Sequence, residues 1–366
     1  MIPKVIICVD GLGKDLITEK SMPFLWKYGQ DNFFSRLKTL FAFTGIEYCF
    51  FSGETPEKSG LWFDFEKSDK SIFNNFFLRF FSFNKKLRNY LGALIQLLNK
   101  RDYIVGLHNL PRNSLKFFDS SSKKGLWDLD FFKKRSYVLY KWPFFIEKDT
   151  EVRKSILFRY EDDSNRLKRL LSSRKKDVYY VQLMQIDKII HKYGKKSART
   201  KEELRKIDKV LENFIKKFNR NEIIIWSDHG FADIKEYIDI EKMLPKRKDF
   251  LYFIAGTSAH FWFNNNDAKK EVLECVKKIK GVKILDKKLA KNYKIPLDRK
   301  YGDLFIFIEK GRYFFPNFYQ GSLKERFVSM HGYPDNKELD GFFLSNKSIN
   351  KKDKTLKMKD IVDILR

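Results

Sequence analysis

The sequence predicts an α/β fold, a doubly wound and mostly parallel sheet with helices on both faces, plus cap insertions. Three apolar runs lead to this prediction, and they cover residues 4–9, 178–184 and 222–226. Unbroken apolar runs of this length are typical of strands buried on both faces of a parallel sheet. Between the second and third runs, apolar residues recur at helical spacing, which gives the strand–helix–strand order of such a sheet.

Further elements are expected along the chain. The run Thr200-Lys-Glu-Glu203 is a capping box and predicts that a helix begins there. Residues 53–60 contain Gly, Pro and Ser in a pattern that predicts a turn-rich connector. The other expected elements are helices over 22–28, 87–98, 268–279 and 355–365, and strands around 303–308 and 342–344.

Two less regular stretches interrupt the predicted core. The longer one is rich in Phe, Lys, Arg and Tyr and shows little periodicity, so we interpret it as a cap insertion over one edge of the sheet. The shorter one begins with a predicted helix and continues into short strands. The expected division is therefore a core of 1–65, 177–263 and 327–366, with insertions at 66–176 and 264–326.

Composition limits the class of protein. A chain of 366 residues with 43% hydrophobic residues can bury a sizeable core, which excludes a disordered protein. The net charge of +27 favours anionic partners such as phosphorylated metabolites or an acidic membrane surface, and nucleic acid is not required. Because the lysines are dispersed, the charge also fits a compositional bias of the source.

Cysteine usage and hydropathy give an expected location. The three cysteines are odd in number, widely spaced and set in apolar runs, so we expect free thiols in a reducing compartment and a cytoplasmic protein. No stretch reaches about 18 apolar residues, so we expect no transmembrane segment and, at most, peripheral membrane contact.

Acidic and histidine side chains follow two of the predicted strands. Asp10 comes directly after the first apolar run, and Asp228-His229-Gly230 follows the run over 222–226. Ligands gather at the carboxyl ends of strands in open parallel sheets, so we expect these side chains to converge. Carboxylate oxygen and imidazole nitrogen are ligands for divalent metal ions.

Two more motifs carry the same ligand chemistry. Asp187 and His191 are four residues apart and would share one face of a helix. His331 lies in the run His331-Gly332-Tyr333, ahead of an apolar strand. Each motif alone also fits an ordinary turn or a solvated surface. Their joint occurrence, in order and at strand ends, predicts a site for two neighbouring metal ions.

Thr44 is the candidate nucleophile. It lies in an apolar stretch just before Gly45 and upstream of the turn at Gly53. A hydroxyl next to a metal ion loses its proton more readily and can attack phosphorus. Thr44 could also cap a helix N-terminus, and such a terminus favours a bound phosphate.

Together these motifs resemble the alkaline phosphatase superfamily, most closely its type I phosphodiesterase and nucleotide pyrophosphatase branch. Thr44 stands one residue closer to the Gly53 turn than the usual spacing of that branch. Sulfatases fit less well, because the run from Cys49 lacks their Pro and Arg. The resemblance rests on a strand ending in Asp10-Gly, Thr44 ahead of Ser52-Gly53 with Pro56 and Gly60, then Asp187-x3-His191, Asp228-His229-Gly and His331-Gly-Tyr.

This resemblance implies a two-metal hydrolase of phosphoric esters, usually with zinc and with manganese as the alternative. Asp187, His191 and His331 would hold one ion. The other would be held by Asp10, Asp228, His229 and the Thr44 hydroxyl. Thr44 would act as the nucleophile and form a covalent phospho-enzyme intermediate.

The expected substrate is a small phosphate ester. Substrate choice would reside in the cap insertions. The basic and aromatic residues that suit a nucleotide or another anionic, partly planar substrate are Lys85, Lys86, Arg88, Arg112, Lys133, Arg135 and Trp142, although they also fit a solvated face. Two other functions fit the sequence: a non-catalytic or highly specialised relative that binds anionic partners, and a phosphatase acting in surface polysaccharide or glycolipid synthesis.

Overall fold

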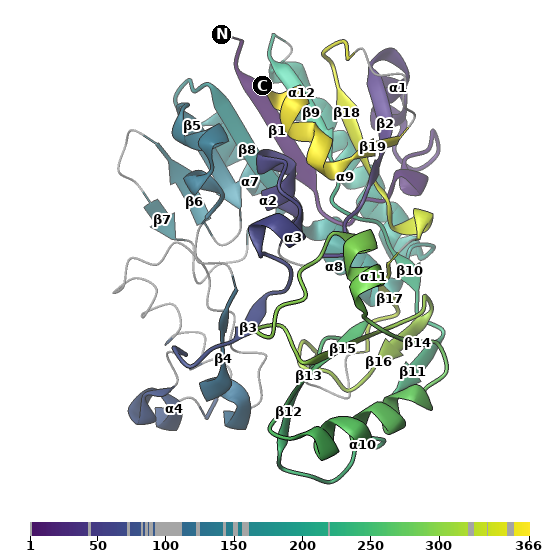
Figure 1. The fold of residues 1–366 in the computed structure, drawn as a ribbon. Coiled ribbons are helices and arrows are strands. Elements are labelled where there is room, and N and C mark those ends of the chain that lie inside the picture. Colours follow the sequence, from purple (N-terminus) through teal and green to yellow (C-terminus); the bar gives the residue numbers. More distant parts are fainter. Residues whose placement is uncertain are drawn as a thin grey trace.

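A nine-stranded mixed sheet forms the centre of the protein in the computed structural model (Figure 1). The structure describes residues 2–42, 45–71, 74–81, 83–84, 87, 91, 112–121, 125–141, 144–148, 153–155, 161–218, 220–320, 326–334, 336–349 and 355–366. The strand order is β19 (Thr355–Lys357), β2 (Phe33–Lys38), β18 (Gly341–Ser345), β9 (Glu222–Trp226), β1 (Lys4–Val9), β8 (Val178–Leu183), β5 (Tyr137–Lys141), β6 (Phe144–Glu147) and β7 (Arg153–Ser155).

The middle of this sheet is parallel. β1 pairs in parallel with β8 on one side and β9 on the other, and β5 pairs in parallel with β8. β18 and β6 are the strands that run against their neighbours in the described sheet. Every residue of β1 and of β8 is buried, as the unbroken apolar runs predict. The prediction of a doubly wound, mostly parallel α/β sheet is therefore confirmed.

Helices cover both faces of the sheet because alternate residues of each strand point to opposite sides. Val5, Ile7 and Val9 join one apolar cluster, whereas Ile6 and Cys8 join the other. The first cluster includes residues of α1 (Pro23–Asp31), α7 (Asp163–Leu171), α8 (Gln185–Tyr193) and α9 (Ala198–Lys217). The second includes residues of α2 (Gly45–Ser52), α6 (Asp130–Lys133) and α12 (Ile361–Leu365).

A second, smaller sheet lies below the first in Figure 1. It is antiparallel and is built from β12 (Phe250–Ile254), β13 (Ser258–Phe263), β15 (Leu304–Ile308) and β14 (Val282–Ile284). Two helices, α10 (Asn266–Lys277) and α11 (Lys287–Tyr293), follow β13 and β14. The predicted helix over 268–279 and the strand around 303–308 are both present.

Short elements complete the described chain. Three two-stranded sheets pair β3 (Phe65–Lys67) with β4 (Phe118–Ser120), β10 (Ala232–Asp233) with β17 (Ser329–Met330), and β11 (Glu236–Ile238) with β16 (Arg312–Phe314). The short helices are α3 (Pro56–Ser59), α4 (Phe76–Phe81) and the 3-10 turns η1 (Lys14–Leu16), η4 (Arg112–Phe117), η5 (Leu126–Asp128), η6 (Lys337–Leu339) and η7 (Met358–Asp360). Within the described residues, no helix is both long and apolar enough to cross a bilayer.

Some predicted boundaries differ from the structure. The stretch 66–176 is not only a cap, since it supplies β5, β6 and β7 to the main sheet. The smaller sheet likewise begins at Phe250, ahead of the expected insertion at 264–326. The capping box at Thr200 is wrong: Ser197 is the N-cap and accepts a hydrogen bond from Thr200 N at 3.0 Å.

The predicted closing helix over 355–365 is only half present. Its first residues form β19, which pairs in parallel with β2 and is itself the edge of the sheet, and the helix α12 begins at Ile361. Pairing with a distant edge outweighs the local helical pattern. The predicted helix over 87–98 lies almost wholly outside the described residues.

Candidate active site

The loops that follow two neighbouring strands bring the first group of ligands together. β1 and β9 are paired in parallel, so the loops that follow them leave the sheet side by side. Asp10 and Asp228 are both buried there. His229 Nε2 lies 3.4 Å from Asp10 Oδ1 and 3.4 Å from Asp228 Oδ2. Ligand atoms of these three residues all lie within 4.8 Å of one another, which suits a single metal ion.

The second group surrounds Asp187. Ligand atoms of Asp187, His229 and His331 also lie within 4.8 Å of one another. His191, one turn along α8, places its Nε2 3.4 Å from Asp187 Oδ1. Its Nδ1 lies 3.0 Å from the Ser329 carbonyl oxygen, an arrangement that favours a proton on Nδ1 and leaves Nε2 free as a ligand. The structure thus brings together all six predicted side-chain ligands among the described residues.

His331 is distant in the sequence, and a small two-stranded sheet places it beside the other ligands. β17 ends at Met330 and pairs with β10, which starts shortly after His229. The His331 ring stacks on the His229 ring, with centroids 3.7 Å apart and an angle of 13° between the planes. His229 therefore borders both ligand groups, and the two groups are adjacent.

Gly11 allows the loop that follows β1 to pass close to α8. Its φ is +71°, a left-handed conformation that favours glycine. A Cβ at this position would lie 2.6 Å from the Phe231 ring and 3.1 Å from the Cα of Asp187. The Gly11 amide also donates a hydrogen bond to Asp228 Oδ1 at 3.2 Å. The loop therefore approaches both Asp187 and Asp228 closely.

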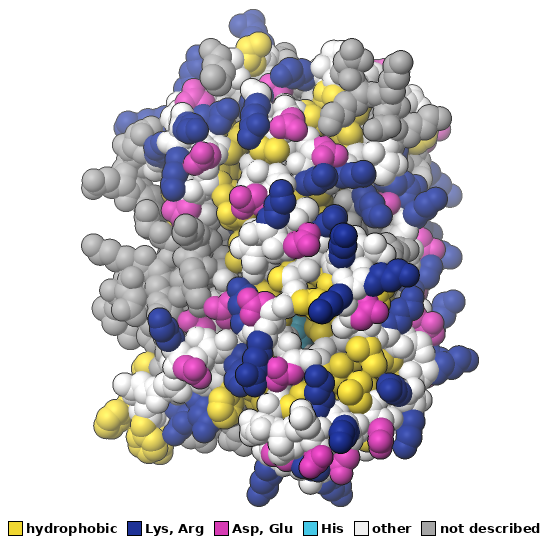
Figure 2. Space-filling view, in the orientation of Figure 1, with side chains coloured by type: hydrophobic (Ala, Val, Ile, Leu, Met, Phe, Trp, Pro, Cys, Tyr) yellow, Lys and Arg dark blue, Asp and Glu magenta, His cyan; other side chains and the backbone are white. Residues whose placement is uncertain are grey.

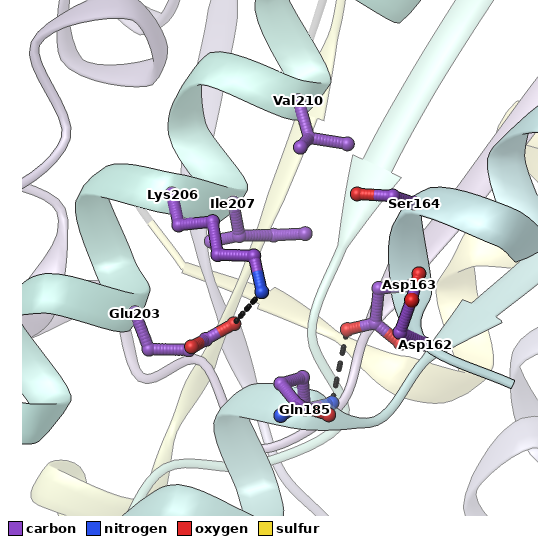
Figure 3. A pocket seen from close by; sticks show the side chains of 8 residues that line it. All are labelled: Asp162, Asp163, Ser164, Gln185, Glu203, Lys206, Ile207 and Val210. Carbon is purple, nitrogen blue, oxygen red and sulfur yellow. Dashed lines mark hydrogen bonds and ion pairs between the residues drawn. The ribbon is translucent and has the colours of Figure 1, made fainter. Parts of the chain in front are cut away.

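Asp163 fixes the start of α8, the helix that carries Asp187 and His191 (Figure 3). Its carboxylate accepts hydrogen bonds from Met184 N at 3.0 Å and Gln185 N at 2.9 Å. Met184, at the N-cap position, makes no side-chain capping bond of its own. A small pocket beside this cap is lined by Asp162, Asp163, Ser164, Gln185, Glu203, Lys206, Ile207 and Val210. None of the six candidate ligands lines it, so we interpret it as a packing feature of α7, α8 and α9.

Burial and crowding of charges shift the pKa of Asp10, Asp187, His229 and His331. Burial and the neighbouring Asp228 raise the pKa of Asp10 to about 7. Burial lowers the pKa of His229, but Asp228 and Asp10 outweigh it and raise the value to about 10. Burial raises the pKa of Asp187, yet His191 and His331 bring it below its usual range. Burial, together with the neighbouring His229 and His191, holds the pKa of His331 well below its usual value, so His331 is neutral and can bind metal.

The donor set fits divalent metal ions. Asp187 Oδ1 is buried and accepts no hydrogen bond from the described residues. A buried carboxylate oxygen without a donor is costly, and a cation would satisfy it. Three imidazoles with three carboxylates suit zinc or manganese.

Thr44 lies outside the described residues, so its role stays a prediction. The helix that follows it, α2, begins at Gly45. α2 packs on the main sheet through Phe50, whose ring stacks on Trp226 at the end of β9 with centroids 3.8 Å apart. α2 is therefore anchored to the same strand that leads to Asp228.

Sequence reasoning missed several polar residues beneath the site. Gln182 donates a hydrogen bond from Nε2 to Asp10 Oδ2 at 2.9 Å, and its signal was a single polar residue in an apolar run. Glu47 in α2 accepts a hydrogen bond from the Tyr180 hydroxyl and forms an ion pair with Lys141. Glu47 is buried, and burial lowers the pKa of Lys141 to about 8.

Two of the predicted substrate-binding residues lie elsewhere. Lys133 and Arg135 precede β5, whereas the ligands follow the carboxyl ends of the parallel strands. They are therefore at the opposite edge of the sheet, and that prediction is wrong for them. Nothing is described of the other five side chains in that set. His260 is buried in the smaller sheet with its Nδ1 2.6 Å from Tyr301 O, and burial lowers its pKa to about 3, so it is structural.

Comparisons with known proteins give the family and the fold. Residues 4–334 match the family described as type I phosphodiesterase / nucleotide pyrophosphatase. Human ectonucleotide pyrophosphatase/phosphodiesterase 5 superposes with a TM-score of 0.70 and 14% identity, over 99% of this chain and 93% of that chain. An inactive variant of the murine protein in complex with AMP gives a TM-score of 0.68 and 13% identity, over 100% of this chain and 94% of that chain. A further structure of murine ectonucleotide pyrophosphatase/phosphodiesterase 5 gives a TM-score of 0.67 and 13% identity, over 99% of this chain and 94% of that chain.

No curated protein sequence matches this chain significantly. The structural likeness is at low identity and concerns the fold. The family match spans nearly the whole chain and confirms the resemblance seen in the motifs. The chain belongs to the type I phosphodiesterase / nucleotide pyrophosphatase family of hydrolases.

Proposed function

We propose that this protein is a two-metal phosphoric ester hydrolase with Thr44 as nucleophile. The observation that supports it best is the convergence of six ligand side chains, from the ends of three strands and one small sheet, at one point of the sheet edge. Buried groups of charged side chains with strongly shifted pKa values are typical of functional sites.

The proposed assignment divides the ligands between two ions. Asp187, His191 and His331 would hold one ion. The other would be held by Asp10, Asp228 and His229, with Thr44 beside it; that group matches one of the two clusters in the structure. His229 also approaches the first group, so the two ions would be neighbours. Zinc is the proposed metal and manganese the alternative.

The reaction would proceed in two displacements. The metal ions would supply positive charge that lowers the pKa of a bound hydroxyl and stabilises the transferring group. The Thr44 oxygen attacks phosphorus, the bond from phosphorus to the leaving oxygen breaks, and that oxygen takes a proton. A water oxygen then attacks the phospho-threonine, the bond from phosphorus to the Thr44 oxygen breaks, and Thr44 regains its proton.

Chain residues around the site support these steps. Gln182 orients Asp10, and the Gly11 amide orients Asp228, because each holds one carboxylate oxygen by a hydrogen bond. That the inactive murine relative carries a threonine-to-alanine substitution agrees with a threonine nucleophile. Its complex with AMP makes a nucleotide the first substrate class to test here. We also propose a cytoplasmic location, and the expectation of free thiols behind that proposal comes from the sequence.

The test is hydrolysis of bis-p-nitrophenyl phosphate, p-nitrophenyl phosphate and thymidine 5′-p-nitrophenyl phosphate. Metal-stripped protein should be inactive, and turnover should return with Zn²⁺ or Mn²⁺. The preferred ester would separate a diesterase from a monoesterase. No turnover in folded protein with measured metal content would refute the proposed reaction on these substrates and favour the anion-binding alternative.

Two variants separate the nucleophile from the metal site. Thr44→Ala should abolish turnover and retain bound metal, whereas Asp228→Asn should lower both. Ser52→Ala is the matched control, since it removes a hydroxyl at the other end of α2 that donates to the Tyr48 carbonyl and accepts from the Glu54 amide. Retained activity in Thr44→Ala would show that the nucleophile assignment is wrong.

A further inference from the structure

Three of the proposed metal ligands are histidines, and one phenylalanine ring contacts all of them. The Phe231 ring meets the His191 ring edge-on, with centroids 4.7 Å apart and an angle of 88° between the planes. The corresponding values are 5.5 Å and 75° for His229, and 5.4 Å and 86° for His331. Phe231 is fully buried. Because His229 belongs to one proposed metal group and the other two histidines to the second, this ring borders both groups.

The backbone explains why the ring of Phe231 reaches the histidines. Phe231 directly precedes β10, and His331 directly follows β17. Ala232 lies opposite Met330 in this antiparallel pair, so the two aromatic side chains are also opposite each other. The loop after β1 closes on the other side of the ring, since a Cβ at Gly11 would lie 2.6 Å from its Cε2 atom. The ring is therefore held between two segments of main chain.

A second ring, that of Phe327, contacts His191. The two rings stack with centroids 4.4 Å apart and an angle of 29° between the planes. The Tyr237 hydroxyl donates a hydrogen bond to the Phe327 carbonyl at 2.6 Å, and the Val328 amide donates to the His191 carbonyl at 2.9 Å. Phe327 is partly buried and packs on a different apolar cluster from Phe231. Figure 2 shows histidine atoms in one small recess near the middle of this face, close to hydrophobic side chains.

Ring packing has to orient His331 because hydrogen bonding does not. A metal-binding histidine is usually oriented by a hydrogen bond at its second ring nitrogen. The His191 ring has such a partner in the Ser329 carbonyl oxygen. The His331 ring has no hydrogen-bond partner in the part of the chain that the structure describes. Its orientation therefore depends on the stack with His229 and on the edge-on contact with Phe231, a favourable geometry for aromatic pairs.

We propose that Phe231 is a positioning residue shared by both metal ions, and that Phe327 positions a ligand of one ion only. This inference rests on the proposed two-metal site and goes beyond it, because neither ring binds metal itself. Loss of the Phe231 ring would disturb ligands of both ions. Loss of the Phe327 ring would disturb only the ion that Asp187, His191 and His331 hold.

Zinc titration of the metal-stripped full chain against a competing chelator tests the proposal. Phe231→Leu keeps a buried apolar side chain but removes the ring, and both zinc affinities should fall at least about tenfold. Phe327→Leu should lower one zinc affinity by about tenfold and leave the other unchanged. Phe214→Leu is the matched control, because Phe214 is buried in the same apolar cluster as Phe231 but packs on Phe218 at the end of α9. Its two zinc affinities should equal those of the wild type.

Cobalt absorption adds a readout that a general loss of stability would not change. The visible bands of bound Co²⁺ depend on the geometry of its ligands. These bands should change in Phe231→Leu and stay like the wild type in Phe214→Leu, although the urea midpoint of the metal-stripped protein should fall in both. Phe327→Leu alters a partly buried side chain, so its loss of one affinity decides the matter even where Phe231→Leu does not fold.

The outcomes separate this inference from the proposed site. A wild-type protein that binds neither zinc nor cobalt would refute both. Wild-type zinc affinities in Phe231→Leu, beside two-zinc binding by the wild type, would overturn the positioning role alone. Equal losses of zinc affinity in Phe231→Leu and Phe214→Leu would also overturn it, since general destabilisation would then explain them. So would a Phe327→Leu variant that loses both affinities or neither.

Discussion

Asp163 offers the sharpest test of how the fold positions the metal site. The carboxylate is 4% exposed and caps α8 through two backbone amides, Met184 N and Gln185 N. Asp163→Ala leaves both amides buried without an acceptor. Bonds to a charged acceptor contribute about 1.5–3 kcal/mol each, but burial of the carboxylate offsets much of this, as its raised pKa shows. We therefore expect a net loss of about 2 kcal/mol, at the upper end for a helix cap.

The same substitution should weaken metal binding, because α8 carries Asp187 and His191. Loss of a group that orients metal ligands typically lowers metal affinity by about 10–100-fold. The assay is urea unfolding of metal-stripped protein, followed by zinc titration with a competing chelator. We expect a lower unfolding midpoint and a zinc affinity at least about tenfold weaker.

Asp162→Ala is the matched control. Asp162 is the adjacent residue and carries the same charge, but it caps α7 through the Asn165 amide at 2.8 Å. Its loss should cost about 1 kcal/mol and leave zinc affinity unchanged. Equal zinc affinity in the two variants would refute the view that the cap of α8 positions the ligands.

Three further predictions concern the site and its surroundings. Zinc binding at pH 7 should release roughly one to two protons, because the metal displaces the protons that His229 (pKa about 10) and Asp10 (pKa about 7) otherwise bind, and zinc affinity should rise with pH towards 10. Calorimetry in buffers of different ionisation enthalpy measures the number of protons released. A zinc affinity that does not change with pH would contradict this prediction. Gly11→Ala should destabilise the protein by more than Gly60→Ala. Gly60 is also left-handed (φ +70°) but has space for a Cβ, so its substitution should lower the free energy of unfolding by only about 1–2 kcal/mol, whereas at Gly11 the Cβ would also overlap the Phe231 ring. Equal unfolding midpoints would count against this. Lys141→Met should lower the free energy of unfolding in urea by about 2 kcal/mol, because its partner Glu47 in α2 is then buried without a counter-ion. A free energy of unfolding equal to that of the wild type would show that the ion pair does not stabilise the protein.

The parts of the fold that the sequence predicts are those with a strong local pattern. β1, β8 and β9 are unbroken apolar runs, and the parallel rule then places Asp10 and Asp228 at one edge. The spacing of Asp187 and His191, four residues apart, likewise predicts that they share one face once the segment is known to be a helix. The motif makes His331 a candidate ligand, but its position depends on the pairing of β17 with β10, which no local pattern reveals.

The elements that were missed depend on partners distant in the sequence. β5 ends in Lys141, and its place beside β8 is determined by the sheet and not by its own pattern. β19 is a strand because the edge of β2 is open to it. The ion pair between Glu47 and Lys141 joins α2 to β5, so it becomes visible only after both are placed. Propensity describes segments, whereas these features arise from contacts between them.

The wide separation of the ligands along the chain has a consequence for how the protein assembles. Asp10 follows the first strand of the main sheet, whereas His331 arrives only when β17 pairs with β10. Until that pairing forms, the ligand group around Asp187 lacks one of its members, so a partly folded chain would bind metal weakly. Tight binding would then be restricted to the complete topology, and an ion bound there would act as a cross-link between distant segments. Removing it should therefore lower the cooperativity of unfolding as well as its midpoint.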